Sequence, residues 1–438
     1  MESLLHYLWQ YQLYDKLEFV TSNAYSDNTI EIIDPGQLNH HAGPDFFNAK
    51  VKVNDLTLVG NIEIHLKSSD WVKHRHQHDP AYDNVILHIV AEHDTPCYNS
   101  QGKPLDTGVM YIPEYTRLEA QRMLHHDEFP SCSLRLPNLD NIQKIQWLDR
   151  LTSERLEQKA NNILQSYQEC RGNWGEVFYR LLMRYFGFGL NNDAMEMLAR
   201  SIPFSIIQKH RNNMMQIEAV LMGQASLLPE IPEDDYTYKL KTEYEFMRHK
   251  FSLKPLPRGV FKMHRIRPAN FPHRRIAQVA SILHREEFLP DKCLYTTSLG
   301  DLDKFFETTI SKYWEKHYHF KSNETIQNIF SGRLSDLGIK ILLINVAIPF
   351  IFAYGIKEQN EELKVRAIDF LDKIPAENNR YTRQFKKQGI RAKTAAESQA
   401  LVWLSKNYCE KKKCYYCQWG RLFLTTPLVK GNMPNTGV

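Results

Sequence analysis

The pattern of apolar residues changes near Pro130, and this change limits the possible folds more than any other feature. Before Pro130, short β-branched or alternating stretches predict strands at 29–33, 46–53, 56–67 and 84–91. Beyond it strand patterns almost vanish, and apolar residues recur at helical spacing in 141–164, 174–186, 193–201, 214–222, 276–283, 302–313 and 363–371. We therefore predict an α/β domain at 1–130, a mainly α-helical region at 131–400, and a Cys-containing segment at 401–438 packed on that region.

Charge divides at the same place. Residues 1–130 hold 9 Lys and Arg against 19 Asp and Glu, a net charge of −10, whereas the rest holds 46 against 32, a net charge of +14. Nine of the 18 histidines precede residue 94. Carboxylates and imidazoles are the side chains of metal and proton chemistry, and basic surface attracts polyanions. We expect the chemistry in the first domain and a nucleic acid partner for the basic region.

Composition excludes several classes of protein. Apolar residues make up 42% and charged residues 24% of the chain, as in globular proteins and unlike disordered ones. The most apolar stretch, Ile339–Tyr354, is 16 residues long and contains Lys340 and Asn345, so we expect a buried helix and no membrane span. Seven cysteines, an odd number, argue against a disulfide framework. With no basic and apolar leader, we expect a cytoplasmic protein.

The most informative residues lie on two neighbouring predicted strands. Asp45 begins one strand, and Glu63, His65 and Lys67 alternate along the next, so these three share a face. An Asp and a Glu brought together by a hairpin form a site for a hard cation, and we expect Mg²⁺ or Mn²⁺ there. His65 or Lys67 would orient the attacking water or steady phosphate charge.

The hairpin register tests this hypothesis. A two-residue turn at Asn54-Asp55 pairs Val53 with Leu56, which places Asp45 opposite Ile64 and away from Glu63. One extra residue, in the turn or in a bulge at Gly60, would place Asp45 opposite His65 on the face of Glu63. The site therefore requires an irregularity, and we expect it at one of these two places.

Three histidines follow the motif at alternate positions, namely His74, His76 and His78. All three share a face only if the backbone is extended, whereas on a helix His74 and His78 share one. They either add ligands or a general base near Glu63, or they lie on a solvated polar helix.

Other histidines are weaker candidates. His40 and His41 directly precede Asp45 and either assist the site or are merely exposed. His88 lies in an apolar strand and is expected in the core. The first helix could direct one polar residue toward the site, and the candidates are Glu2, His6 and Gln10.

These residues resemble two known patterns. The sequence Pro44-Asp45…Glu63-Ile64-His65 resembles the PD-(D/E)xK nuclease motif, with His65 where that family usually carries Lys. The order of helix, three strands, helix and strand is also similar to the core of that superfamily. The resemblance implies a restriction-endonuclease-like fold, a mixed sheet flanked by helices, and a metal-dependent nuclease. Lys67, one step along the same face, could take the usual Lys role.

A second resemblance covers nearly the full length. Five segments together resemble a bacterial family catalogued as domain of unknown function 2851. They are HHAGPDFFNAKV, GNIEIHLKSSDW, YDNVILHIV, RPANFPHRR and YCEKKKCYYC. This resemblance implies no activity, so the nuclease hypothesis depends on the first motif and its chemistry.

The spacing Cys409-x4-Cys414-x2-Cys417 predicts a second metal site, because two thiolates from one tight turn can reach one metal. We expect a structural Zn²⁺ or an iron–sulfur cluster, and the alternative is free thiols. A fourth ligand is missing locally, and it could be a His or one of Cys97, Cys132, Cys170 and Cys293.

A proline-bounded basic segment lies in the helical region, and its arginines are Arg265, Arg267, Arg274 and Arg275. Prolines hold such a segment extended, so its side chains either contact a phosphate backbone or pair with the acidic domain. Two hypotheses for the whole chain follow. The first is a metal-dependent nuclease that processes DNA or RNA, and the second is a non-catalytic nucleic-acid-binding or scaffold protein with a nuclease-like fold.

Overall fold

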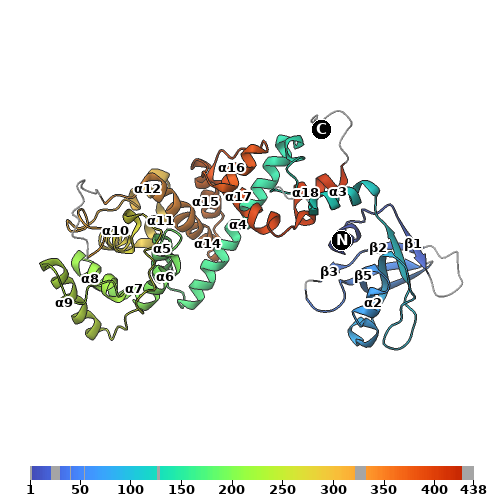
Figure 1. The fold of residues 1–438 in the computed structure, drawn as a ribbon, viewed down its shortest axis with the longest axis horizontal. Helices are drawn as coiled ribbons and strands as arrows, with labels where there is room; N and C mark the ends of the chain where they lie inside the picture. Colours follow the sequence, from blue (N-terminus) through green and yellow to red (C-terminus); the bar gives the residue numbers. More distant parts are fainter. Residues whose placement is uncertain are drawn as a thin grey trace. The chain divides into compact units, whose positions relative to one another are not determined.

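The computed structural model describes residues 2–20, 30–39, 41–53, 55–125, 129–320 and 332–426. The chain forms two compact units. We call residues 1–147, 383–390 and 403–438 the sheet unit, and residues 148–382 and 391–402 the helical unit. The predicted α/β domain followed by a mainly helical region is thus observed (Figure 1). The Cys-containing segment, which the sequence placed with the helical region, is grouped with the sheet unit instead.

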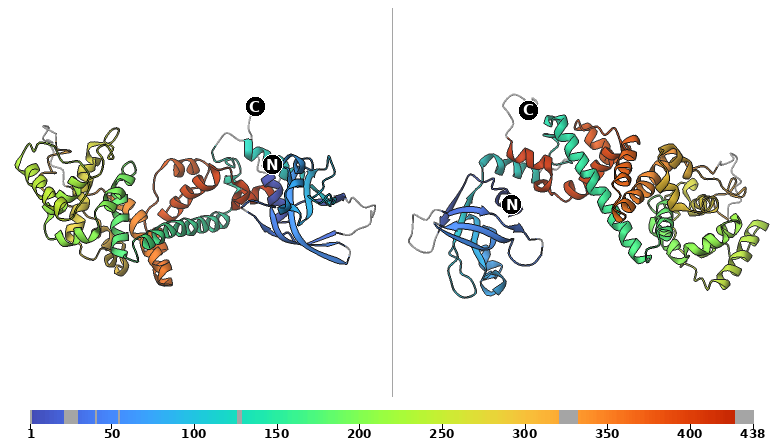
Figure 2. Two further views of the ribbon diagram at one scale, coloured as in Figure 1. Left: turned by 90° about the horizontal axis from the view of Figure 1, so that it is seen from below. Right: turned by 180° about the vertical axis from the view of Figure 1, so that it is seen from behind.

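One mixed sheet organises the sheet unit, with strand order β1-β7-β6-β5-β4-β2 and with β3 paired to β4. β5–β6 and β6–β7 are parallel pairs and the others are antiparallel. Figure 2 shows that the sheet is curled. In chain order, the elements of this unit are α1 (Glu2–Gln10), β1 (Lys16–Val20), β2 (Ile30–Asp34), β3 (Gln37–Leu38), β4 (Phe46–Val53), β5 (Leu56–Lys67), α2 (Asp70–Lys73), η1 (His76–His78), η2 (Pro80–Tyr82), β6 (Val85–Glu92), β7 (Thr107–Tyr111), α3 (Glu114–His125), η3 (Leu136–Asn138), η6 (Ser405–Cys409), η7 (Cys414–Tyr416) and α18 (Gln418–Thr425).

Helix α1 packs on β5 and closes part of the core. Its apolar side chains Leu4, Leu5, Leu8 and Trp9 are fully buried, as the helical spacing of the sequence predicts. The indole N–H of Trp9 donates to the carbonyl of Pro35 at 2.9 Å, so the first helix is also fixed to the loop after β2. The position of α1 matters because the same helix carries His6.

A bulge in β4 sets the register of the central hairpin. From Ala49↔Gly60 to Val53↔Leu56 the pairing follows the simple two-residue turn, but Phe46 pairs with Ile62, one residue out of step. The irregularity lies at Asn48, whose φ of 56° is in the left-handed region that Asn tolerates better than most residues. Asp45 therefore comes opposite Glu63.

The required irregularity thus exists, but our two predicted places for it were wrong. Gly60 pairs regularly with Ala49. A glycine at this position instead allows the chain at the start of β6 to approach closely, because a Cβ there would meet Asn84 O at 2.8 Å and the side chain of Ile86. The shift also runs in the opposite direction, so Asp45 faces Glu63 and not His65.

The bulge yields a first prediction. Asn48→Val places a β-branched residue at positive φ, and we expect it to lower the free energy of unfolding by about 1–2 kcal/mol and to weaken metal binding at Glu63. Asn48→Gly, which removes the side chain but accepts this φ, should retain both properties. Chemical denaturation and metal titration of the two variants check this. Equal behaviour of Asn48→Val and the wild type would contradict it.

The helical unit has one large apolar core that includes the fully buried Phe178, Leu182, Ile276 and Phe350. The remaining helices of the chain are α4 (Asn141–Glu169), α5 (Trp174–Phe186), α6 (Asn192–Ser201), α7 (Phe204–His210), α8 (Met214–Gln224), α9 (Asp235–Lys250), η4 (Pro268–Asn270), α10 (Pro272–Arg285), α11 (Leu289–Tyr295), α12 (Leu299–Phe305), α13 (Asp336–Leu342), η5 (Leu343–Ala347), α14 (Ile348–Lys357), α15 (Glu361–Lys373), α16 (Arg380–Lys387) and α17 (Ala395–Leu404).

The stretch Asp336–Lys357 is long and apolar enough, by length and composition, to cross a membrane. Within the helical unit, however, 67% of its apolar window is buried. Ile344, Ile348 and Phe350 are almost wholly buried in the core. This burial agrees with the prediction of a core helix.

Glu218 is a buried acid in this core. Tyr236 Oη and Ser311 Oγ donate to its carboxylate at 2.7 and 3.2 Å, but burial raises the pKa of Glu218 to about 7. Between the unfolded pKa of 4.5 and about 7, the folded state therefore holds a proton that the unfolded state has released. Folding stability falls as the pH rises through this window.

Glu218→Gln should remove this dependence, because the amide keeps an acceptor for Tyr236 and carries no charge. We expect the variant to gain roughly 3 kcal/mol relative to the wild type between pH 4.5 and pH 8. Denaturation of both proteins across this range measures the difference. A constant difference between them at every pH would contradict the assignment.

Candidate metal centre

Asp45 and Glu63 bind each other across the bulge. The backbone N–H of Asp45 donates to Glu63 Oε2 at 3.1 Å, and the backbone N–H of Ile64 donates to Asp45 Oδ2 at 2.9 Å. The two carboxylates thus replace regular strand pairing at the start of β4 and are held side by side. Burial raises the pKa of Glu63, and the charge of Asp45 raises it further, while His76 opposes the shift.

His65 shares the face of Glu63 and is 1% exposed. Its Nε2 lies 3.4 Å from Glu63 Oε1, and its Nδ1 lies 2.9 Å from Nε2 of His88 on the adjacent strand β6. Burial, with the charges of His76 and His74, lowers the pKa of His65 to about 4, so the ring is neutral near pH 7. If Nε2 is to bind a metal, Nδ1 carries the proton and His88 accepts it.

The chain after α2 turns two more histidines toward this point. His74 is the C-cap of α2 and His76 begins η1, and between them Arg75 adopts a left-handed φ of 65°. His74 Nδ1 lies 3.1 Å from His65 Nε2, and His76 Nε2 lies 3.3 Å from Glu63 Oε1. The backbone of residues 74–78 is therefore neither of the two conformations considered from the sequence, an extended strand or a continuous helix.

Surrounding groups hold this turn in place. The indole of Trp71 is fully buried and donates to the carbonyl of Tyr98 at 3.0 Å, while the ring of Tyr82 stacks on His76 with centroids 3.8 Å apart. Ser68 Oγ and Ser69 Oγ donate to Asp94 at 2.9 and 2.7 Å, which fixes the end of β5 to the end of β6. These hydrogen bonds lower the pKa of Asp94 to about 2.

The result is a cluster of four potential ligands. We call Glu63, His65, His74 and His76 the Glu-His cluster. The donor atoms of its three histidines all lie within 4.8 Å of one another. Glu63, His65 and His76 are buried and His74 is exposed, so a ligand reaches the cluster from the side of His74.

Asp45 has a second partner, His6 of α1. His6 Nε2 lies 3.2 Å from Asp45 Oδ2. Burial alone would lower the pKa of His6, but the hydrogen bond and charge of Asp45, with the charges of Glu2 and Glu63, raise it. Among the three candidates on the first helix, His6 is thus the residue that reaches the site.

Several predicted site residues lie elsewhere. Lys67 Nζ is exposed and pairs with Glu92 at 3.0 Å, so it does not take the Lys role. His41 and His78 are exposed, and neither belongs to the Glu-His cluster. The position of His40 lies outside the described residues.

The basic segment of the helical unit is divided. Arg265 and Arg267 are exposed, as a phosphate contact requires. Arg274 is fully buried and donates to the carbonyl of Trp314 at 3.0 Å, and Arg275 packs on the ring of Phe188 at 3.9 Å. Arg274 is thus a core residue and not the predicted phosphate contact, whereas Arg275 is half-buried and its predicted contact stays a prediction.

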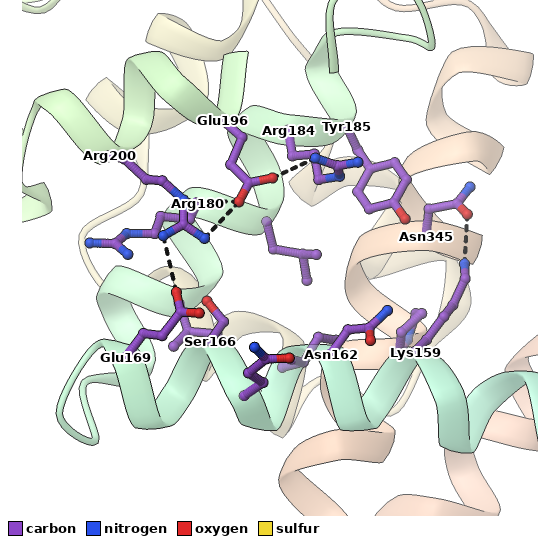
Figure 3. A pocket seen from close by; sticks show the side chains of 15 residues that line it. Lys159, Asn162, Ser166, Glu169, Arg180, Arg184, Tyr185, Glu196, Arg200 and Asn345 are labelled. Atoms are coloured by element: carbon purple, nitrogen blue, oxygen red, sulfur yellow. Dashed lines mark hydrogen bonds and ion pairs between the residues drawn. The ribbon is translucent and has the colours of Figure 1, made fainter. Parts of the chain in front are cut away.

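The helical unit has a polar cavity of about 320 Å³ (Figure 3). Its arginines are neutralised locally, since Arg180 pairs with Glu176, Arg184 with Asp193 and Glu196, and Arg200 with Glu169 and Glu196. The Lys159 amine donates to Asn345 Oδ1 at 2.6 Å, and burial lowers its pKa. Paired in this way, these cations stabilise the fold, and we assign no chemistry to the cavity.

Comparison with known proteins gives one match. The family described as "Protein of unknown function (DUF2851)" matches residues 2–380. The chain belongs to the DUF2851 family. No curated protein and no solved structure matches it. The matched range contains the whole Glu-His cluster together with Asp45 and His6.

The ligand types in this DUF2851 protein indicate which metals suit the cluster. Three imidazoles and one carboxylate are typical ligands of Zn²⁺, Mn²⁺ or Fe²⁺, whereas Mg²⁺ prefers oxygen ligands. The two carboxylates in the sequence had predicted Mg²⁺ or Mn²⁺. Of these two ions, Mn²⁺ fits the observed donor set better.

The cluster yields a prediction on metal binding. His74→Ala should reduce the affinity for Zn²⁺ or Mn²⁺ about 10–100-fold or more, because it removes one of four ligands on a prearranged site. His78→Ala, four residues along the same turn, is the matched control and should bind as the wild type does. Isothermal titration calorimetry of the three proteins measures this. Similar losses in both variants would show that the turn, and not the ligand, was affected.

Proposed function

We propose that this DUF2851 protein is a metal-dependent nuclease that hydrolyses phosphodiester bonds in DNA or RNA. The observation that carries the proposal is the pairing of Asp45 with Glu63 beside three imidazoles. A bound metal ion would supply an activated water at neutral pH and neutralise phosphate charge. Glu63, His65, His74 and His76 would hold the ion, and Asp45 lies next to them.

The donor set supports Mn²⁺ or Zn²⁺ as the metal. His65 occupies the place where the nuclease motif usually carries Lys, and an imidazole there serves as a ligand. The absence of a lysine amine from this position then has a chemical reason. His88 and Tyr82 orient two of the ligands, as outer residues of metal sites commonly do.

His6 and Asp45 support an acid–base role at the exposed flank. Their side chains are 19% and 24% exposed, in contrast to 7% for Glu63, so solvent reaches them more readily than it reaches Glu63. The raised pKa of His6 favours the imidazolium, which can donate a proton to the leaving oxygen. Asp45 would keep the ring in position and stabilise its charge.

Two further features support a nucleic acid substrate and a nuclease-like fold. Residues 131–438 carry a net charge of +14, and exposed Arg265 and Arg267 contribute to it. The order α1, antiparallel β2–β4–β5, α2 and parallel β6 has the element order of the restriction-endonuclease core. The restriction-endonuclease-like fold is part of the proposal.

The test is cleavage of labelled single- and double-stranded DNA and RNA with Mn²⁺, Zn²⁺, Mg²⁺ or EDTA. We expect cleavage with Mn²⁺ or Zn²⁺ and none with EDTA. Asp45→Asn and Glu63→Gln should lower the rate at least 100-fold, because each removes a charge and preserves volume. Lys67→Ala is the control and should stay within about two-fold of the wild type, since its amine pairs with Glu92.

Metal binding without cleavage of any of these substrates would sink the nuclease proposal. It would favour the alternative of a non-catalytic nucleic-acid-binding or scaffold protein. Loss of activity in Lys67→Ala equal to that in Glu63→Gln would contradict the assigned roles.

A further inference from the structure

The Cys-containing segment folds as a compact turn between η6 and α18. Cys409 ends η6, Cys414 begins η7, and Cys417 caps α18. Backbone hydrogen bonds tighten the turn, with Lys413 N–H donating to Tyr408 O at 2.8 Å and Cys417 N–H donating to Cys414 O at 3.2 Å. Gly420 passes so close to the carbonyl of Cys414 that a Cβ would clash with it. The backbone around the three cysteines is therefore closely packed.

A fourth cysteine reaches the same place from the turn before η3. Cys132 lies in this turn, which is fixed to α18 through Arg135. The Arg135 guanidinium donates to Thr426 O at 2.9 Å and lies over the ring of Phe423 at 5.1 Å. The indole N–H of Trp419 also donates to Gln143 O at 3.1 Å, so α18 is held both by Arg135 and by the start of α4.

Cys132, Cys409, Cys414 and Cys417 are free thiols, and none of them forms a disulfide. In each of the six pairs, the charge of one thiolate raises the pKa of the other. Burial is the largest cause of these shifts.

We propose that Cys132, Cys409, Cys414 and Cys417 bind one thiolate-ligated metal centre that fixes the C-terminal helices η7 and α18 to the rest of the sheet unit. The N–H groups of Trp419 and Gly420 hydrogen-bond to the Cys417 sulfur, as backbone amides do around metal-bound thiolates. The sequence supplied three of these ligands and left the fourth open among several residues. The structure selects Cys132.

Two metals fit this thiolate chemistry. A single Zn²⁺ holds sulfur atoms about 3.5–4 Å apart, and an iron–sulfur cluster holds them farther apart. Among the described residues, three potential metal donor atoms lie within 4.8 Å of one another in the set of His65, His74 and His76. No three of the four cysteine sulfurs lie that close together. Metal analysis decides between the two metals, and the ligand residues are the same for both.

The centre also has a consequence for the proposed active site. η7 contacts α1, where Tyr415 stacks on Tyr7 at 6.4 Å, and the Arg421 guanidinium lies over Tyr11 at 3.9 Å. Helix α1 carries His6, which pairs with Asp45. The cysteine centre thus supports the helix that places His6, and this part of the inference rests on the proposed function.

The first experiment measures zinc, iron and acid-labile sulfide in the full chain purified without oxygen. To separate the two sites, the measurement uses His74→Ala as well as the wild type. We expect about one zinc, or about four irons with sulfide and a visible absorption band, to remain in His74→Ala. Neither metal in either protein would overturn the proposal.

The second experiment tests the ligands. Cys132→Ser and Cys414→Ser should each lose most of this metal, whereas Cys170→Ser, a free cysteine of the helical unit, should retain it. Full retention by Cys132→Ser would overturn the assignment of the fourth ligand. Because unfolding of a variant also releases metal, titrating the wild type with a mercurial reagent provides an independent readout, with metal release expected after about four thiols react.

The third experiment tests the link to α1. Metal release from the wild type should increase hydrogen exchange in residues 2–10, while residues 276–283 of the helical unit remain protected. Unchanged exchange in α1 after release would overturn the link. These readouts require no cleavage activity, so they stand or fall independently of the nuclease proposal.

Discussion

The candidate site depends on one local departure from regular strand pairing. If β4 and β5 kept the register of their turn throughout, Asp45 would face Ile64 and its carboxylate would lie on the opposite side of the sheet from Glu63. The bulge at Asn48, which has a left-handed backbone conformation, shifts the pairing by one residue and places Asp45 opposite Glu63. Reciprocal hydrogen bonds between the two acidic residues and the neighbouring backbone then hold the shifted register.

The second constraint is the burial of polar rings in the middle of a small sheet. Burying imidazoles and a carboxylate costs free energy unless each finds a partner. Here the ring of His88 is the partner of His65 and the ring of Tyr82 stacks on His76. The Ser68–Asp94 hydrogen bonds fix the chain that leads to His74. A protein that needed only stability would fill this space with apolar side chains, so the polar cluster is best understood as functional.

Much of this arrangement could be predicted from the sequence. Alternation along β5 identified Glu63 and His65, helical spacing identified the helices of the core, and Cys spacing identified three thiols. β2, β4, β5 and β6 were expected, but β1, β3 and β7 were not. β1 and β3 are short edge strands that bury little, and β7, which lies between β1 and β6, has only five residues and includes Gly108. The helix α9 was missed because its surface is largely polar, and its capping box at Asp234 was the available signal.

The remaining features come from tertiary contacts that no local pattern records. The position of the bulge follows from the conformation of a single Asn. The roles of His6 and Cys132 follow from which distant segments pack together. Lys67 looked like a site residue by alternation, yet Glu92 on the neighbouring strand is its partner. Such choices between nearby partners depend on the register of β5 against β6.

The grouping of residues 403–426 with α1 has a consequence for synthesis of the protein. The ribosome produces α18 long after α1, so the sheet unit cannot be completed until residues 403–426 have emerged. During that time Tyr7 and Tyr11 lack the aromatic and guanidinium groups that later cover them. A nascent chain therefore carries an unfinished sheet unit while the helical unit is already free to fold, and a chain that ends early keeps that surface open.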